Sequence, residues 1–144
     1  MAAGGQGLIV VDVMVPAYLL LPVADATFEE QARRLLEREP RWVAPNLWVS
    51  EFLNICAGHL RAGRMTFDEA AHAVDAAQRL IVTLPVEPGP VMELIPNSRC
   101  SAYDLAYVAA ARELGVPLVT GDRQVLAEFP GVAVTPGAWL ERAG

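Results

Sequence analysis

Residues Leu8-Ile9-Val10-Val11-Asp12 give the clearest indication of architecture in the sequence. Four apolar residues in a row, three of them β-branched, predict a strand covered on both faces, as in a parallel sheet. Asp12 follows at the carboxyl end of this strand. Because ligands of open parallel sheets bind beyond the carboxyl ends of the strands, Asp12 is a candidate site residue. An acid here can equally cap the following helix, and the local pattern leaves both roles open.

Predicted helices and strands alternate along the rest of the chain. Thr27–Glu30 and Thr66–Glu69 have the pattern of capping boxes, and Gly115 can supply a left-handed helix stop. We expect strands at 8–11, 42–44, 81–86, 116–120 and 132–135, and helices at 14–21, 27–39, 46–61, 66–80, 101–115 and 123–129, with 88–98 ambiguous. This alternation predicts a three-layer α/β fold, with a mostly parallel central sheet of about four or five strands and helices on both faces.

The bulk composition is that of one globular domain. The 144 residues fit a single domain over 1–144, in which we expect residues 1–7 to form a flexible N-terminus. The hydrophobic fraction of 53% supports a substantial core. The formal net charge of -6 disfavours nucleic-acid binding unless carboxylates cluster to hold cations, which reverse the local field.

Two features bear on the cellular compartment. Cys56 and Cys100 form neither a disulfide framework nor a metal-ligand pair, which favours core side chains and a reducing, cytoplasmic setting. The apolar stretch 8–24 contains an acid and two prolines, and no basic residue precedes Arg33. It is also shorter than the roughly 20 residues of a spanning helix. We therefore interpret it as internal structure, not as a signal peptide or a membrane span.

Three further acids are candidate site residues because of their positions. Asp122 follows the predicted strand around Leu118 and therefore lies at a second carboxyl strand end. Glu51 has Leu47 and Ile55 as helical neighbours, which places a carboxylate on the face that should be buried. Such a group needs a metal ion, a buried arginine partner or a path to solvent, and the sequence favours function without excluding the others.

Asp104 is the most ambiguous of the four. Ser101-x-x-Asp104 fits a capping box, so the local pattern favours a capping role, with the helix start tucked into the protein. Together the four acids would form a site of oxygen ligands only, which Mg²⁺ and Mn²⁺ prefer. His59 and His72 have no partner at metal-ligand spacing, and we expect them to be structural or surface residues, with His72 facing solvent.

Taken in order, these segments resemble the PIN-domain family, and the VapC-like branch in particular. One such motif is weak evidence, because apolar strands that end in Asp are common. Four motifs in the family's order, covering nearly the whole chain and with Trp48, Asn54 and Tyr103 also in agreement, are specific. The motifs are Leu8–Asp12, Ala44–Asn54, Ser101–Asp104 and Leu118–Asp122.

The resemblance implies a Mg²⁺- or Mn²⁺-dependent endoribonuclease, the toxin of a VapBC-type toxin–antitoxin pair. The family's four acidic positions, which would hold one or two ions, correspond to Asp12, Glu51, Asp104 and Asp122. Asp12 and Asp104 would be direct ligands, Glu51 and Asp122 would bind directly or orient coordinated waters, and Thr120 would hydrogen-bond among them. One ion would deliver hydroxide to the phosphorus, and the same or a second ion would stabilise the departing 3′ oxygen.

The resemblance also implies partners. These are an RNA substrate, an antitoxin protein that covers an apolar groove, and a second copy of the chain in a homodimer, with no membrane involved. Apolar residues among Leu19–Leu21 and Phe52–Ile55 could bind the antitoxin, although packing in the core is the favoured interpretation for both segments.

The sequence departs from the family pattern near two of the acids. Met14 stands where the family usually has Asn, Ser or Thr, Pro16 is unusual, and Arg123 stands where many members have a further acid. These departures keep a second interpretation open, a catalytically degenerate PIN domain that acts as a protein- or RNA-binding module. Receiver domains and haloacid-dehalogenase-type phosphatases need a second acid next to Asp12, where Val13 and Met14 stand.

Overall fold

The computed structural model describes residues 7–22 and 25–143, and within them five strands form one parallel sheet in the order β3-β2-β1-β4-β5. The strands are β1 (Leu8–Val11), β2 (Arg41–Pro45), β3 (Ile81–Leu84), β4 (Leu118–Val119) and β5 (Ala133–Val134). The helices are α1 (Met14–Leu20), α2 (Ala26–Arg38), α3 (Leu47–Arg61), α4 (Phe67–Leu80), α5 (Pro88–Leu94), α6 (Ala102–Leu114), α7 (Arg123–Glu128) and α8 (Pro136–Ala143), with a 3₁₀ turn at Ile95–Asn97. The predicted α/β fold with a parallel central sheet is confirmed.

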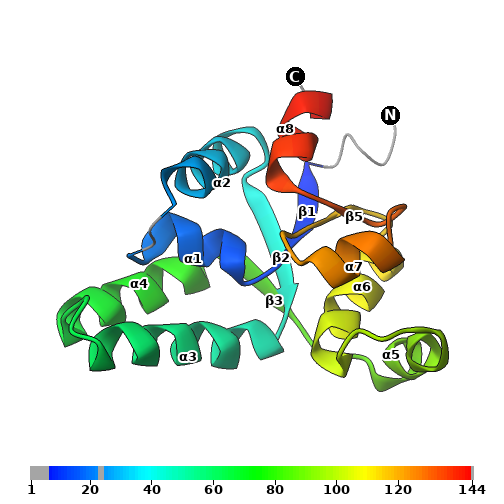
Figure 1. The fold of residues 1–144 in the computed structure, drawn as a ribbon, viewed down its shortest axis with the longest axis horizontal. Coiled ribbons are helices and arrows are strands. Elements are labelled where there is room, and N and C mark those ends of the chain that lie inside the picture. The colour runs from blue at the N-terminus through cyan, green and yellow to red at the C-terminus, as the bar shows by residue number, and fades with distance from the viewer. Residues whose placement is uncertain (1–6, 23–24, 144) are drawn as a thin grey trace.

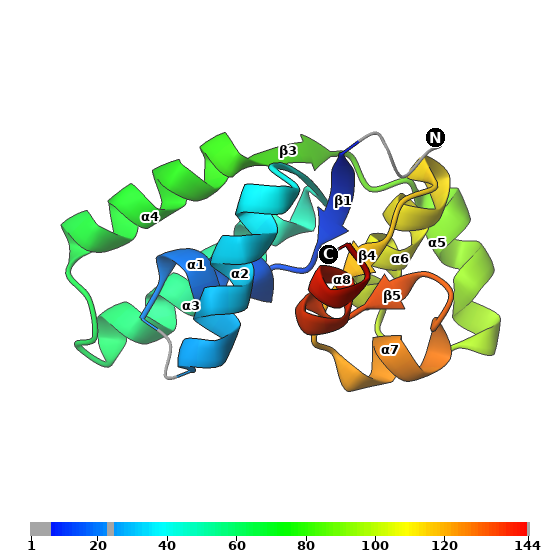
Figure 2. The same ribbon diagram turned by 90° about the horizontal axis from the view of Figure 1, so that it is seen from above.

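The sheet separates two layers of helices. Figures 1 and 2 show α1 to α4 gathered on one side of β1, and α5 and α6 on the other. β1 is central, because Val10 pairs with Val43 of β2 and with Leu118 of β4. Val10 and Val11 are fully buried, as the unbroken apolar run predicts. Burying each such side chain stabilises the fold by about 1.5–3 kcal/mol.

Several helix ends follow their local sequence. Thr66 forms the predicted capping box, in which its hydroxyl accepts from the Glu69 amide at 3.1 Å and the Glu69 carboxylate accepts from the Thr66 amide at 2.8 Å. Gly115 ends α6 with a φ of 67°, a left-handed conformation that glycine adopts without strain.

The starts of two other helices differ from the prediction. The prediction that Thr27 caps α2 is wrong, because the Asp25 carboxylate accepts from the amides of both Thr27 and Phe28 and begins the helix earlier. Asn46 precedes α3 as predicted, but its side chain makes no capping hydrogen bond. Its backbone is already helical, whereas a capping side chain reaches the first turn from an extended backbone.

The strands are shorter than predicted. β3 ends at Leu84, where Pro85 follows and offers no amide to a neighbouring strand. β4 and β5 each contain two residues, so the predicted strands at 116–120 and 132–135 are too long. The ambiguous segment 88–98 contains α5 and the 3₁₀ turn.

The helix α8 is absent from the prediction. Thr135 begins it by accepting a hydrogen bond from the Ala138 amide at 3.1 Å, and the helix packs against α2. Arg38 of α2 donates to the Leu140 carbonyl at 3.0 Å. This helix depends on packing against a distant part of the chain, and its eight residues are too few for stability alone.

The predictions for the cysteines and histidines agree with the structure. Cys56 is buried and Cys100 is partly buried, both with free thiols. His72 is exposed, and His59 is buried with its Nδ1 accepting from Arg64 Nε at 2.8 Å.

The predicted flexible N-terminus falls, for residues 1–6, outside the described residues. The carbonyl of Gly7, which is described, accepts a hydrogen bond from Arg41 Nε at 3.2 Å. Across 7–22 and 25–143, none of the helices is both long and apolar enough to cross a membrane.

Candidate functional site

The four acids singled out from the sequence lie on four separate elements near the carboxyl ends of the central strands. Asp12 directly follows β1, and Glu51 lies in α3, which begins where β2 ends. Asp104 is in the first turn of α6, and Asp122 caps α7 just after β4. The negative charges of Asp104 and Asp122 both raise the pKa of Asp12, and those of Asp12 and Asp104 raise the pKa of Glu51. Asp12 and Asp104 therefore lie within electrostatic reach of each other and of both Glu51 and Asp122.

Asp12 is held by two hydrogen bonds. Its Oδ1 accepts from the Met14 amide at 2.8 Å, and its Oδ2 accepts from the Thr120 hydroxyl at 2.6 Å. The residue as a whole keeps some exposure, but its carboxyl group is surrounded by protein. Burial is the main cause of its raised pKa, and the two hydrogen bonds oppose that shift. An ionised Asp12 is therefore costly unless a cation joins it.

Thr120 links two of the acids. It is only 1% exposed, and its hydroxyl donates to Asp12 while accepting from the Asp122 amide at 3.0 Å. The predicted hydrogen bond from Thr120 into the site is confirmed. Asp122 Oδ1 accepts from the Val125 amide at 3.0 Å, which caps α7 and leaves Oδ2 outside that bond. Capping and a role in the site are compatible for Asp122.

Glu51 is held by a residue that the sequence did not reveal. Its Oε1 accepts a hydrogen bond from the buried hydroxyl of Tyr107 at 2.6 Å. Burial is the main cause of the raised pKa of Glu51, and the Tyr107 bond opposes it. Burial and the Glu51 carboxylate raise the pKa of Tyr107, so the phenol remains a donor. The available sequence indication was that Tyr107 follows Asp104 by three residues, on the same face of α6.

Asp104 lies at a helix start that is capped by Ser101. Its amide donates to the Ser101 hydroxyl at 3.1 Å, so Ser101 caps α6. The pKa of its carboxyl group is raised, first by burial and then by the charge of Asp122, while contacts with Ser101 oppose the shift. The predicted burial of this helix start is right for Leu105 and wrong for Tyr103, which is 67% exposed. Consecutive helix positions point about 100° apart, so one turn contains both environments.

No arginine neutralises these acids in the part of the chain that the structure describes. The ion pairs there are Arg33–Glu30 and Arg79–Asp75, both on the surface of other helices. The buried arginine partner considered for Glu51 is thus replaced by a phenol. A group of carboxylates in which three have raised pKa values, and with which no described arginine forms an ion pair, is chemically suited to a hard divalent cation.

The spacing of the carboxylates limits how such an ion could be held. Among the described residues, no three carboxylate, imidazole or thiol side chains are gathered closely enough to hold a metal ion. Mg²⁺ typically keeps several water ligands and binds through only one or two carboxylates. The donor set fits that cation if some of the acids act through coordinated water.

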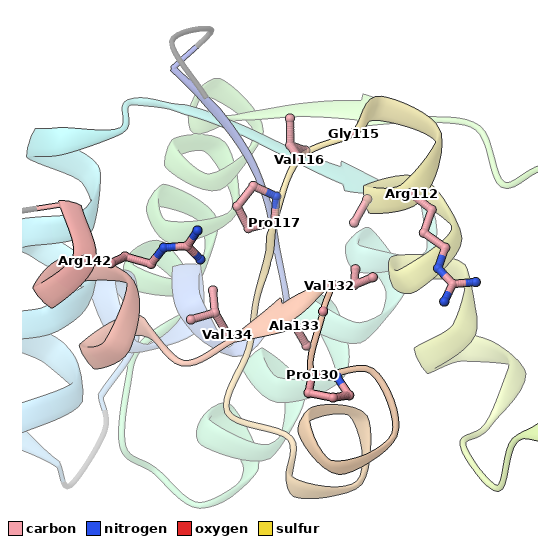
Figure 3. Close-up of a pocket in the computed structure, with 11 residues that line it drawn as sticks. Arg112, Gly115, Val116, Pro117, Pro130, Val132, Ala133, Val134 and Arg142 are labelled. Atoms are coloured by element: carbon pink, nitrogen blue, oxygen red, sulfur yellow. The ribbon is translucent and has the colours of Figure 1, made fainter. Parts of the chain in front are cut away.

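A cavity of about 430 Å³ lined by basic rather than acidic side chains lies at the amino ends of β4 and β5. Figure 3 shows Arg112 and Arg142 on opposite sides of it, with Pro117 and Val134 between them. None of the four acids lines this cavity. The cavity therefore lies at the other end of the strands from the four acids.

Comparison with known proteins assigns the chain to a family. The sequence model of the PIN-domain family matches residues 9–132 of this chain. The chain belongs to the PIN-domain family. This PIN domain is 30% identical over 133 residues to Ribonuclease VapC3 of Pyrobaculum aerophilum, a match that covers 89% of this chain and 98% of that protein. The family resemblance inferred from the four motifs is thus confirmed, including its VapC-like character.

Solved structures share the fold. PAE2754 from Pyrobaculum aerophilum superposes with a TM-score of 0.72 at 22% identity, covering 96% of each chain. A toxin–antitoxin complex from Klebsiella pneumoniae gives 0.64 at 15% identity, covering 89% of this chain and 97% of that one. Mycobacterium tuberculosis VapC20, described as a sarcin-ricin loop cleaving toxin, gives 0.63 at 22% identity, covering 83% and 94%. The PIN-like architecture is shared over nearly the full length.

The departures of this PIN domain from the family pattern are compatible with its structure. The Met14 side chain is exposed while its amide supports Asp12, so the supporting bond does not depend on the side chain at this position. Pro16 lies in the first turn of α1, where a missing amide costs no helical hydrogen bond. Arg123 is exposed at the first position of α7.

Proposed function

We propose that this PIN domain is a Mg²⁺- or Mn²⁺-dependent endoribonuclease that acts in the cytoplasm as the toxin of a VapBC-type pair. The observation that carries the proposal is the group of four carboxylates, from four elements, that act on one another electrostatically and have no arginine partner among the described residues. The relative named Ribonuclease VapC3 supports the ribonuclease part.

The residues divide into ligands and supports. We assign Asp12 and Asp104 as direct ligands, and Glu51 and Asp122 as ligands or as acceptors that orient coordinated water. A bound divalent ion would supply an acidified water and neutralise charge on the leaving oxygen. Thr120 fixes Asp12 relative to Asp122, and Tyr107 fixes Glu51, so the acids keep their places despite mutual repulsion.

The net charge of -6 is compatible with an RNA substrate under this proposal. A bound divalent ion reverses the field at the acids, where the phosphodiester must approach. Arg123 is adjacent to Asp122 in the chain and exposed, so it is placed to contact a neighbouring phosphate.

The proposed antitoxin needs an apolar surface. α3 and α4 border a groove of about 390 Å³, where Leu53 is 48% exposed and Phe67 is 75% exposed. We propose that the antitoxin covers this groove, whereas Leu21 is buried and offers little surface. The structure of a toxin–antitoxin complex with the same fold supports such a partner. A homodimer remains part of the proposal, and analytical ultracentrifugation of the purified chain tests it.

The first test is calorimetric titration of Mn²⁺ into the wild-type protein and the Asp12→Asn and Asp104→Asn variants. Asp68→Asn is the matched control, because Asp68 is an exposed acid on α4. We expect wild type and the control to bind alike, and both site variants to lose at least about tenfold in affinity. Cleavage of a panel of structured and single-stranded RNAs follows, with the same variants.

Each outcome separates the interpretations. Binding that both site variants weaken, together with Mn²⁺-dependent RNA cleavage, supports the proposed enzyme. A folded wild-type protein that binds no Mn²⁺, with or without RNA, contradicts the proposal and favours the degenerate binding module. Metal binding that the site variants leave unchanged would place the ion elsewhere and contradict the assignment of the four acids.

A further inference from the structure

The carboxylate of Glu128, the last residue of α7, accepts hydrogen bonds from three donor groups. Its Oε1 accepts from the Ser98 hydroxyl at 2.5 Å, and its Oε2 accepts from the Arg99 amide at 3.0 Å and from Gln124 Nε2 at 2.6 Å. These bonds lower the pKa of Glu128, so the carboxylate stays ionised. Two of the three donors belong to a segment about thirty positions away in the chain.

That distant segment leads directly into the helix that carries Asp104. Ser98 also accepts from the Cys100 amide at 3.0 Å, and Ser101 then caps α6. Glu128 lies at the other end of α7 from its cap, Asp122. One carboxylate therefore joins the base of the helix bearing Asp104 to the helix that begins at Asp122.

The two joined acids repel each other. Asp122 is the largest electrostatic contribution to the raised pKa of Asp104 after burial. α7 has only six residues, which pack against β5 and contact the core through Val125 and Leu126, and the bonds of Glu128 hold its last residue. Next to Glu128, the Phe129 ring packs against a small apolar cluster and lies 5.5 Å from the Arg112 guanidinium.

We propose that Glu128 is a positioning residue for the metal site, which holds the helix starts bearing Asp104 and Asp122 at a fixed separation before the ion binds. The inference rests on the proposed function and adds to it a residue outside the four acids. Glu128, Ser98 and the Arg99 amide form a hydrogen-bonded clasp. In the wild-type protein the clasp offsets the repulsion between Asp104 and Asp122. Without the clasp, part of the binding energy of the ion is used to overcome this repulsion, so the apparent affinity for the ion falls.

The experiment compares Mn²⁺ binding, by calorimetry without RNA, in wild type and Glu128→Gln. The Gln amide keeps the size of the side chain but cannot accept hydrogen bonds at both ends. Glu113→Gln is the matched control, since Glu113 is an exposed glutamate on α6 outside the described clasp. Ser98→Ala removes one donor and tests the same clasp from the other side, should Glu128→Gln fold poorly.

The proposal expects Glu128→Gln to weaken Mn²⁺ binding by about tenfold, with Ser98→Ala weaker by less and Glu113→Gln unchanged. It also expects RNA cleavage by Glu128→Gln to recover at saturating Mn²⁺, so that the half-saturating Mn²⁺ concentration rises while kcat returns to within about twofold. Asp104→Asn should not recover. Equal Mn²⁺ affinity in wild type and in both clasp variants overturns the positioning role alone. Absence of Mn²⁺ binding in wild type overturns the proposed function, and this inference with it.

Discussion

The two ends of the strands in this parallel sheet differ in charge. We call the carboxyl ends of β1 and β4 the acidic edge and the amino ends of β4 and β5 the basic edge. At the carboxyl ends of β1 and β4, burial and then the negative charge of Asp122 raise the pKa values of Asp12 and Asp104, and no described arginine pairs with these acids. At the amino ends of β4 and β5, a cavity of about 430 Å³ is lined by Arg112 and Arg142 and by no acid (Figure 3). This cavity therefore lies away from the proposed metal site. The perturbed carboxyl groups are the guide to that site, because they mark where the protein maintains unfavourable charge.

Burial of acids at the acidic edge lowers the stability of the fold, and the basic edge has no such cost. Asp12 and Glu51 are partly or wholly buried, and their partners are Thr120 and Tyr107 rather than cations. Removing a partner should therefore affect metal binding at the acidic edge, while the same kind of change at the basic edge should affect only packing.

The largest effect is expected from Thr120→Val, which removes the hydroxyl that joins Asp12 and the Asp122 amide. The shape is preserved, but the partly buried Asp122 amide and the buried Asp12 carboxylate each lose a partner. We expect the free energy of unfolding to fall by about 1–3 kcal/mol. Mn²⁺ affinity should fall by about 10–100-fold, measured by calorimetry.

Thr135→Val is the control for this change. Thr135 caps α8 through its hydroxyl, so its loss should lower stability by about 1 kcal/mol without altering Mn²⁺ affinity. Equal Mn²⁺ affinity in Thr120→Val and wild type would show that the Thr120 bond is structural only.

Tyr107→Phe should give the next largest effect, because it deletes the donor to Glu51. We expect a loss of about 1.5 kcal/mol in unfolding free energy, from chemical denaturation. Mn²⁺ affinity should fall by about tenfold. Tyr103→Phe, which removes an exposed hydroxyl on the same helix, should match wild type in both measurements. A Tyr107→Phe protein that binds Mn²⁺ normally would remove Glu51 from the metal site.

The pH dependence of stability should reveal the cost of the acidic edge. A carboxyl group whose pKa is raised by folding stabilises the protein fully below its unfolded-state pKa, and this contribution is lost as the pH rises through the folded-state pKa. Asp12 has an unfolded reference of 3.8 and a raised folded pKa, caused mainly by burial. As the pH rises from about 4 to 7, the metal-free wild type should therefore lose stability relative to Asp12→Asn.

The measurement is the difference in Tm between wild type and Asp12→Asn across that pH range, which cancels the titrating groups that do not interact with Asp12. Saturating Mn²⁺ should stabilise wild type and reduce or reverse the difference. A difference that stays constant with pH would contradict the raised pKa of Asp12.

The smallest effect is expected at the basic edge. Arg112→Ala removes the guanidinium that lies 5.5 Å from the Phe129 ring. Stability should fall by about 0.5–1 kcal/mol, measured by thermal denaturation. Mn²⁺ affinity should stay within about twofold, because charges beyond roughly 8 Å are screened at physiological salt. A larger loss of Mn²⁺ affinity would show that the two edges are coupled.

Sequence reasoning singled out the four acids and Thr120, which holds Asp12, but not Tyr107, which donates to Glu51. Asp12 and Asp122 could be assigned to one edge because each follows a strand, and strands joined by helices run parallel. The bond between Tyr107 and Glu51 joins residues 56 positions apart, and depends on how α3 and α6 pack. The role of Glu128 likewise depends on where the segment before α6 meets α7.

The sequence by itself determined the parallel α/β order and the helix boundaries at Thr66 and Gly115. These follow from interactions within one or two helical turns, or from the period and length of apolar runs, which neighbouring residues specify. Only the tertiary structure decided that Asp25 begins α2 in place of Thr27, that α8 forms against α2, and that a phenol rather than an arginine meets Glu51. Those outcomes depend on competition between partners that meet only after folding, when burial makes each unsatisfied polar group costly.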